Sequence, residues 1–303
     1  MSYKAGFLGL IGQPNAGKST LMNFLVDQKV SIVSAKPQTT RRRILGISST
    51  DKGQIVFVDA PGVIKAEKGL NGFLAHEARD VISDSDALLA IISLDESKPE
   101  DAGQVIDLVS SSGKPWIGVI TKTDIEEKVH RILILKKMIE EKGGKALTIS
   151  VKREEKNTPE RESMLADFLS ILPDSPAPLY DVDLFTSENV REMVAEVIRE
   201  KCFEFLHHEI PYSLAVRIVK FDETEGPIPK IYAEIMVAKE SHKGIIVGTG
   251  AKMVKEIGIQ SRIEIEKIMD TKVFLDLKVS CKPEWFDNKR IMKELGYVIE
   301  SKD

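Results

Sequence analysis

The sequence predicts an α/β fold in its first half, followed by a smaller α+β domain. Three observations lead to this prediction. Short apolar runs alternate with amphipathic helical stretches from residue 5 to about residue 172. A stretch with three prolines and many acidic residues then follows at 172–188, and proline disfavours regular helix there. Beyond it, the order of predicted elements changes. We therefore expect domains at 1–173 and 189–303, joined by a linker at 174–188.

The apolar runs of the first half predict strands buried on both faces of a sheet, because several are apolar at consecutive positions. The expected strands are 5–12, 43–49, 54–60, 87–94, 115–121 and 146–150. The expected helices between and after them are 18–27, 70–84, 100–112, 125–142 and 159–171. This alternation predicts a doubly wound sheet with helices on both faces and its ligand at the carboxyl ends of the strands.

Composition is typical of a globular protein that stays in a reducing compartment. The chain has 303 residues with a net charge of −4, so any nucleic-acid site must come from a local basic surface. The two cysteines, Cys202 and Cys281, have no metal-ligand spacing. The first apolar run lacks the features of a signal peptide, and no run approaches the ~18 residues that span a bilayer. We expect a cytoplasmic monomer.

The segment "GQPNAGKST" follows the first predicted strand and precedes the first predicted helix. It fits the phosphate-binding pattern G-x-x-x-x-G-K-[ST], in which backbone N–H groups and a helix N-terminus surround the β-phosphate. Lys18 would contact the β- and γ-phosphates, and Ser19 would ligate Mg²⁺. The residues expected to bind nucleotide here are Gly12, Asn15, Ala16, Gly17, Lys18, Ser19 and Thr20.

Two further strand ends narrow the prediction to a guanine nucleotide. "VDAPG" places Asp59 to hold Mg²⁺ through water, with the N–H of Gly62 at the γ-phosphate. "TKTD" resembles the N-K-x-D guanine motif, in which Asp124 would accept hydrogen bonds from guanine N1–H and the 2-amino group. Adenine offers no such donors, so Asp124 discriminates against it. The remaining base contacts are expected from Thr121, Lys122, Ser150 and Val151.

The segment between 29 and 44 is where a nucleotide-sensing switch belongs. We expect Thr40, with Thr39 as the second choice, to complete the Mg²⁺ shell when the γ-phosphate is present. Three arginines follow, at 41–43, and a solvated face is the favoured interpretation of them. RNA contact and transition-state charge stay open as alternatives.

Three positions bear on catalysis. Thr121 stands where the guanine motif usually has asparagine, and its hydroxyl can still tie the base loop to the phosphate loop. Val63 stands where Ras-like switches have a water-orienting glutamine. Another group must therefore stabilise the charge that develops in the transition state. Asn15 is a candidate, because GTPases with a similar P-N-x-G-K-S loop use this asparagine to hold K⁺; loop capping is the alternative. The expected catalytic residues are Lys18, Thr40, Gly62 and Asn15.

The second half contains another glycine-rich segment, "GIIVGTGAKMVKEIG". It lacks the G-K-[ST] ending, so nothing in it would ligate Mg²⁺. The expected order is helix 189–208, strands 212–221 and 230–239, this loop, helix 251–269, strand 271–280 and a short closing helix. That order matches a KH module, whose G-x-x-G loop approaches a nucleic-acid backbone. The expected RNA-binding residues are Lys243, Gly244, Ile245, Gly248, Thr249, Gly250, Ala251, Lys252 and Lys255.

With both halves considered, the chain resembles the Era family of bacterial GTPases. The resemblance rests on "QTTR", "VDAPG", "EIPYSLAVRIVKFDE", "HKGIIVGTGAKMVKEIG" and "WFDNKRIMKELGY", in family order over nearly the whole chain. It implies a P-loop G domain followed by a type II KH domain, with GTP hydrolysis coupled to small ribosomal subunit assembly. It also implies that the KH module binds the 3′ end of small-subunit ribosomal RNA, and that the protein associates peripherally with the membrane.

The sequence departs from the family at the KH loop. The family usually has G-K-G-G there, whereas this chain has Gly248, Thr249, Gly250 and Ala251. We expect a negative φ at Ala251, as the first residue of a helix, and RNA binding with a reduced salt dependence. Alternatives are a small-molecule kinase or ATPase with the same phosphate loop, a tRNA-modification GTPase and a large-subunit assembly factor.

Overall fold

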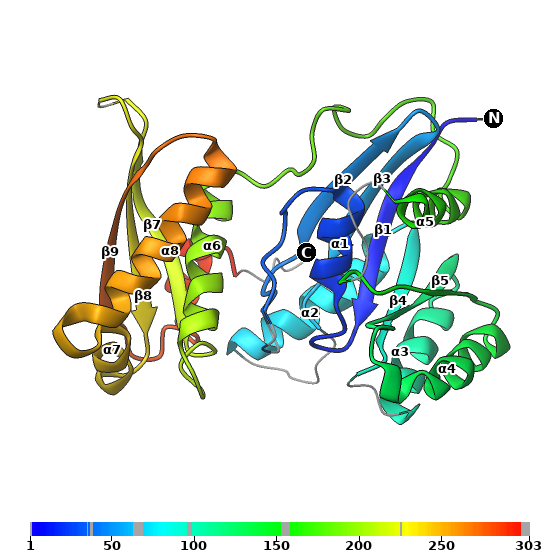
Figure 1. The fold of residues 1–303 in the computed structure, drawn as a ribbon, viewed down its shortest axis with the longest axis horizontal. Helices are drawn as coiled ribbons and strands as arrows, with labels where there is room; N and C mark the ends of the chain where they lie inside the picture. The colour runs from blue at the N-terminus through cyan, green and yellow to red at the C-terminus, as the bar shows by residue number, and fades with distance from the viewer. Residues whose placement is uncertain are drawn as a thin grey trace. The chain divides into compact units, whose positions relative to one another are not determined.

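The computed structural model describes residues 2–34, 36, 39–62, 69–95, 99–152, 158–224 and 226–297. The chain divides into two compact units, Met1–Ser187 and Glu188–Asp303. Each has its own sheet and hydrophobic core, as Figure 1 shows by the two groups of strands.

The first unit is the predicted doubly wound α/β domain. Its sheet has the strand order β2-β3-β1-β4-β5-β6, and all neighbours are parallel except β2 and β3. The strand predicted at 43–49 is present as β2, but its antiparallel direction was not predicted from the sequence. The elements are β1 (Lys4–Gly12), α1 (Lys18–Val26), β2 (Ile44–Thr50), β3 (Gly53–Asp59), α2 (Gly69–Asp84), β4 (Ala87–Ser93), α3 (Pro99–Ser110), β5 (Trp116–Thr121), the 3₁₀ turn Glu126–Lys128, α4 (His130–Glu141), β6 (Lys145–Thr148) and α5 (Pro159–Ser170).

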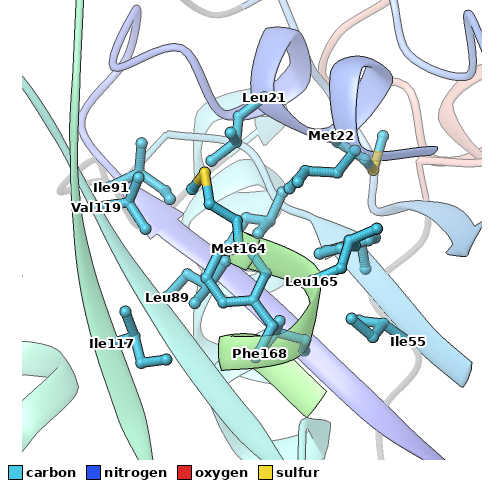
Figure 2. Close-up of a cluster of buried hydrophobic side chains, with 14 of the residues drawn as sticks. Leu21, Met22, Ile55, Leu89, Ile91, Ile117, Val119, Met164, Leu165 and Phe168 are labelled. Atoms are coloured by element: carbon cyan, nitrogen blue, oxygen red, sulfur yellow. The ribbon is translucent and has the colours of Figure 1, made fainter. Parts of the chain in front are cut away.

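Helices pack on both faces of this sheet. Side chains of α1 and α5 form one core with the strands, as Figure 2 shows for Leu21, Met22 and Phe168. Phe57 and Phe168 meet edge to face in this core. Residues of α2, α3 and α4 fill the opposite face. Strands β3 and β4 are buried along their whole length, as the consecutive apolar runs predict. Because the strands are parallel, the segments after β1, β3, β4 and β5 meet at one edge of the sheet.

The stretch predicted as a linker is hydrogen-bonded to the first unit. The N–H of Ile47 donates to the Phe185 carbonyl at 2.8 Å, and Thr186 Oγ1 donates to the Leu45 carbonyl at 2.7 Å. The buried Gln54 accepts from the N–H of Tyr180 at 2.9 Å and of Leu179 at 2.8 Å. These bonds place the stretch along β2 and β3.

The second unit is an α+β domain with the sheet order β7-β8-β9, in which β7 and β8 are antiparallel and β8 and β9 parallel. Helices α6 and α8 pack against it around a separate core (Figure 1). The elements are α6 (Val190–Phe205), β7 (Leu214–Asp222), β8 (Lys230–Val237), α7 (Glu240–Val247), the 3₁₀ turn Thr249–Ala251, α8 (Lys252–Met269), β9 (Phe274–Cys281) and α9 (Lys289–Glu294).

Helix α7 is absent from the sequence-based prediction, which has a loop there. Its sequence contains Gly244 and the β-branched run 245–247, both of which lower helix propensity. Ile246 is fully buried in the core of the unit and His242 is 5% exposed, so tertiary packing stabilises a helix that local propensity does not favour.

None of the described helices combines the length and the apolar character that a membrane crossing requires. The thiol of Cys202 is buried, which raises its pKa to about 12, and both cysteines are free.

Candidate functional site

The phosphate loop connects β1 to α1 at the carboxyl edge of the first sheet. Gly17 has a φ of 90° and Asn15 a φ of 63°, so the loop turns back on itself before the helix begins. Lys18 is buried beneath it, and its Nζ donates to the carbonyls of Gly12 at 3.2 Å and Gln13 at 3.1 Å. Burial lowers the pKa of Lys18, and the neighbouring Asp59 opposes that shift.

Three hydroxyls converge on the carboxylate of Asp59. Oδ2 accepts from Ser19 Oγ, from Ser31 Oγ at 3.2 Å and from Thr40 Oγ1 at 3.4 Å. The Ser19 and Thr40 hydroxyl oxygens are 3.0 Å apart. The hydroxyl of Thr39 donates instead to the Lys36 carbonyl at 2.7 Å, so Thr40 occupies the position by Asp59.

The Asp59 cluster has the chemistry of a Mg²⁺ site. The carboxyl is fully buried, which raises its pKa, while Lys18 and the three hydroxyls act in the opposite direction. Its Oδ1 is buried and has no hydrogen-bond partner among the described residues. Hydroxyl and carboxylate oxygens are the ligands that Mg²⁺ takes, and an unpaired buried oxygen fits a bound cation or its water.

A cavity of about 600 Å³ opens between the phosphate loop and the loop at the end of β5. We call the latter, residues 121–125, the base loop. The lining of the cavity combines phosphate-loop, switch and base-loop residues: Pro14, Asn15, Gly17, Lys18, Ser19, Thr20, Ile32, Val33, Ser34, Thr39, Thr40, Gly62, Asp95, Thr121, Lys122, Asp124, Ile125, Val151 and Lys152. Of the predicted nucleotide residues, Gly12, Ala16, Asp59 and Ser150 lie behind this lining, where they bond to residues that belong to it.

The base loop is tied to its neighbours by two hydroxyls. Thr121 Oγ1 donates to the Ala16 carbonyl at 2.7 Å, which is the bond expected of the threonine that replaces asparagine. Ser150 Oγ donates to Asp124 Oδ1 at 2.6 Å and orients that carboxylate. Lys122 has a φ of 57°, which turns the chain sharply before Asp124.

Gly62 lies against the phosphate loop. A Cβ at this position would be 2.6 Å from the backbone nitrogen of Pro14, so only glycine fits without moving the loop. Gly62 also lines the cavity. Val63, the predicted replacement of the catalytic glutamine, lies outside the described residues.

A solvated face is the wrong interpretation of two of the three arginines. Arg41 is 3% exposed, and Arg43 pairs with three carboxylates of α2. The run was interpreted as exposed because consecutive charges usually face water. Here the chain leaves the switch in an irregular conformation, and α2 supplies the acids.

Sequence reasoning missed two residues of the site. Ser31 donates to Asp59, and Asp95 accepts from Lys128 and lies 3.6 Å from Lys122 Nζ at the base end of the cavity. Asp95 follows a buried strand, so its place at the carboxyl edge of the sheet was an available signal. Ser31 lies in an irregular segment, and no local sequence pattern marks it as a residue of the site.

The second glycine segment forms a tight turn between α7 and α8. Gly248 and Gly250 have φ values of 71° and 61°. Lys243, Gly244 and Ile245 lie on α7, Thr249 is in the turn, and Lys252 and Lys255 are in the first turn of α8. The Ile245 side chain is 52% exposed, and Lys243 pairs with Glu240 at 3.5 Å.

The expectation of a negative φ at Ala251 is wrong. Ala251 has φ 59° and ψ 23°, because it is the cap that precedes α8 and not the first helical residue. A left-handed conformation costs a residue with a Cβ about 1 kcal/mol. The fourth glycine of the family loop therefore relieves a strain that this chain retains.

We expect Ala251→Gly to raise the free energy of unfolding of the second unit by about 1 kcal/mol, because glycine adopts this conformation without the Cβ penalty. Denaturant unfolding of the full chain measures it. Ala195→Gly, within helix α6, is the matched control and should lower stability by a similar amount. Equal losses in both variants would contradict the assigned strain.

An apolar groove of about 210 Å³ lies beside the first turns of α8, against β9. Its lining is Val254, Lys255, Gly258, Ile259, Arg262, Leu275 and Leu277. Two cations at an apolar groove beside a G-x-x-G turn suit a single nucleic-acid strand, whose phosphates meet the cations and whose bases lie on the apolar surface.

Comparisons with known proteins agree with this division of the chain. A family model described as "50S ribosome-binding GTPase" matches residues 7–122, and a "KH domain" model matches residues 209–286. The chain is 38% identical over 304 residues to the GTPase Era of Geobacter sp. (strain M21), which covers 97% of this chain and 98% of that protein. It is 37% identical over 306 residues to the GTPase Era of Thermoanaerobacter sp. (strain X514), with 100% and 99% covered.

Two solved structures share the fold over the whole chain. One is a variant of Aquifex aeolicus Era bound to GDP·AlF4⁻, with a TM-score of 0.90, 31% identity, and 98% of this chain and 100% of that chain covered. The other is Era in complex with MgGDPNP and nucleotides 1506–1542 of 16S ribosomal RNA, with the same TM-score, identity and coverage. With relatives matched over nearly their whole length and a nucleotide pocket followed by a KH fold, the chain belongs to the Era family of GTPases.

Proposed function

We propose that the protein hydrolyses GTP with Mg²⁺ and binds the 3′ end of small-subunit ribosomal RNA during assembly of the small ribosomal subunit. The observation that carries the proposal is the convergence of Ser19, Thr40 and Asp59 in the cavity that Asp124 also lines. The solved Era complex with MgGDPNP and 16S ribosomal RNA supports the same pairing of ligands.

In this proposal each end of the cavity has a separate task. Asp124, held by Ser150, accepts from guanine, and the backbone N–H groups of the phosphate loop surround the β-phosphate. Lys18 moves its Nζ from the loop carbonyls to the β- and γ-phosphates. Ser19 and Thr40 would ligate Mg²⁺, with Asp59 acting through water; the cation neutralises charge that develops on the phosphates.

The second unit would hold RNA along α8. The turn at 248–251 brings backbone N–H groups close to phosphates, and Lys252 and Lys255 add charge from the first helical turn. The groove beside Lys255 receives the bases. The RNA-contacting set proposed from the sequence lies on α7, this turn and the start of α8.

Two measurements on the full chain test the proposed function. GTP turnover is expected with Mg²⁺ and not with EDTA, and ATP should not compete. Affinity for a ribosomal 3′-end RNA is then measured with a GTP analogue, GDP and no nucleotide, against tRNA and a large-subunit RNA fragment. Preference for tRNA or the large-subunit fragment would support one of the alternative GTPase classes. Equal RNA affinity in all nucleotide states would contradict a nucleotide-controlled RNA site.

We expect Thr249→Lys to increase the affinity for ribosomal 3′-end RNA and to steepen its salt dependence. One more phosphate contact adds about 0.7 to the slope of log K against log salt for a single strand. Binding titrations between about 50 and 200 mM salt measure this slope. Thr271→Lys, at an exposed position just beyond the far end of α8, is the same substitution and adds the same charge away from the turn; an equal change in slope there would contradict a phosphate contact at position 249.

We expect GTP turnover to be faster in K⁺ than in Na⁺ if Asn15 holds a potassium ion beside the phosphates. Two observations support this role: Asn15 lines the cavity, and its left-handed backbone conformation lies in the turn that precedes α1. Asn15→Ala should abolish the difference between the two salts. Equal wild-type rates in K⁺ and Na⁺ would remove Asn15 from the mechanism.

We propose a cytoplasmic location and a monomeric state, as the sequence predicts, and peripheral association with the membrane, as the resemblance to the Era family implies. The mass of the full chain in solution, and its sedimentation with anionic vesicles, test the last two.

A further inference from the structure

Arg43 joins the end of the switch segment to α2, two parts of the first unit that are distant in the sequence. It lies three residues after Thr40 and immediately before β2. Its guanidinium contacts three carboxylates of α2, the helix that follows Gly62: Glu77 at 3.2 Å, Asp80 at 3.3 Å and Asp84 at 3.1 Å. The Arg43 N–H also donates to Glu77 Oε2 at 3.3 Å.

The acidic residues form one stripe on α2. Positions 77, 80 and 84 are spaced by three and four, so they lie on the same face of the helix. Like charges at this spacing repel one another, and the planar guanidinium of arginine can donate to several carboxylates at once. Glu77 is almost fully buried, Asp84 is half exposed, and His76 Nδ1 also lies 2.8 Å from Asp80.

The backbone beside Arg43 is fixed from the other side by the sheet. Ile44 begins β2 and pairs with Asp59, the last residue of β3. The short segment from Thr40 to Ile44 is therefore held between the strand that carries Asp59 and the helix that follows Gly62. A change in the position of α2 would be transmitted to Thr40 through this segment.

Resting on the proposed function, we propose that Arg43 is a positioning residue for GTP hydrolysis. By holding the end of the switch against α2, it fixes Thr40 at the position beside Asp59 that the γ-phosphate-bound state requires. The residues proposed to contact GDP lie elsewhere, on the phosphate loop and at Thr121, Lys122 and Asp124, all of which line the cavity. Arg43 is therefore expected to affect the binding and hydrolysis of GTP, and not the contacts that GTP and GDP have in common.

The test compares Arg43→Gln with the wild-type full chain. We expect kcat for GTP hydrolysis to fall about tenfold and the affinity for a non-hydrolysable GTP analogue to fall by a similar factor, within the range of site-to-site coupling. GDP affinity should stay unchanged, which also serves as the folding check. Glu77→Gln removes the same contact from the α2 side and should reproduce the result; Arg43→Lys, which keeps the charge but not the fork, should restore only part of the activity.

Asp107→Asn is the matched control. It breaks the 2.8 Å ion pair between α3 and Lys142, which also links two elements of the first unit but does not line the cavity. This variant should leave kcat and the ratio of GTP-analogue to GDP affinity unchanged.

Two results would overturn the assignment of Arg43. One is an unchanged kcat and an unchanged affinity ratio in Arg43→Gln. The other is an equal loss of GDP and GTP-analogue affinity in both Arg43→Gln and Glu77→Gln, which would make the cluster a support of the fold alone. Failure of the proposed function is a separate outcome, because the wild-type chain itself would then not hydrolyse GTP.

Discussion

Asp124→Asn is expected to exchange guanine for xanthine as the preferred base. Guanine offers N1–H and a 2-amino group, and a carboxylate accepts from both. Xanthine has a 2-oxo group instead of the amine, so an asparagine can accept from N1–H with its oxygen and donate to the 2-oxo group with its amide. The variant should lose about 10³-fold in GTP affinity and gain a similar factor for XTP, since a buried site rejects a base that leaves its polar groups unpaired.

The structure supplies a control for this exchange. Ser150 Oγ donates to Asp124 Oδ1 at 2.6 Å, so Ser150→Ala removes the bond that orients the carboxylate but leaves the carboxylate in place. It should weaken GTP by less than about tenfold, the worth of one hydrogen bond, with no gain for XTP. Competition of GTP, XTP and ATP against a fluorescent guanine nucleotide measures the base preference of both variants and of the wild-type chain. Unaltered GTP preference in Asp124→Asn would show that another residue recognises the base.

The nucleotide site was predictable because its chemistry lies in short segments that end buried strands. The sequence order of parallel strands places Lys18, Asp59 and Asp124 at one edge of the sheet without knowledge of side-chain packing. Thr121 is a further example: its bond to the Ala16 carbonyl follows from the residue type and from the strand end at which it lies. Thr40 was favoured over Thr39, and the hydroxyl that reaches Asp59 is that of Thr40.

What the sequence did not reveal depends on contacts between distant segments. Helix α7 forms because Ile246 enters a core built from other elements, against its own weak propensity. The φ of Ala251 depends on where α8 begins, and a shift of one residue changes its sign. Arg43 was assigned to solvent because its partners lie on α2, more than thirty positions later in the chain. Arg41 is buried although it lies in a run of three charged residues, which usually face water. The stretch before the second unit was expected to be a linker, yet it bonds to β2 through Thr186.

Lys18→Met is expected to lower kcat/KM for GTP hydrolysis by about 10³-fold. Lys18 carries the one positive charge that the phosphate loop itself contributes to the cavity, and methionine keeps much of its length and volume without that charge. Loss of a charged donor to the transferred phosphate removes stabilisation that is strongest in the transition state. Both GTP and GDP affinity should fall as well, because Lys18 is proposed to contact the β-phosphate, which both nucleotides carry.

The same substitution should change the pH dependence of stability. Burial raises the pKa of Asp59 and Lys18 lowers it, so in the variant that pKa lies still higher. A carboxyl whose folded pKa exceeds its unfolded value lowers stability as the pH rises through that interval. Lys18→Met should therefore lose more stability, relative to wild type, at pH 8 than at pH 5. A loss that does not depend on pH would contradict the coupling between Lys18 and Asp59.

Lys114→Met is the control for the loss of a lysine that donates hydrogen bonds to backbone carbonyls without contributing to the cavity. Lys114 Nζ donates to the carbonyls of Ser83 and Ser85, as Lys18 Nζ does to those of Gly12 and Gln13, but Lys114 does not line the cavity. Its substitution should change stability without changing kcat/KM. If Lys18→Met turned over GTP at the rate of Lys114→Met, the lysine of the phosphate loop would have no part in catalysis. Both variants remove a lysine that donates to two carbonyls, and of the two lysines Lys18 is the one that lines the cavity, so a loss of kcat/KM confined to Lys18→Met would assign the effect to a cation in the cavity.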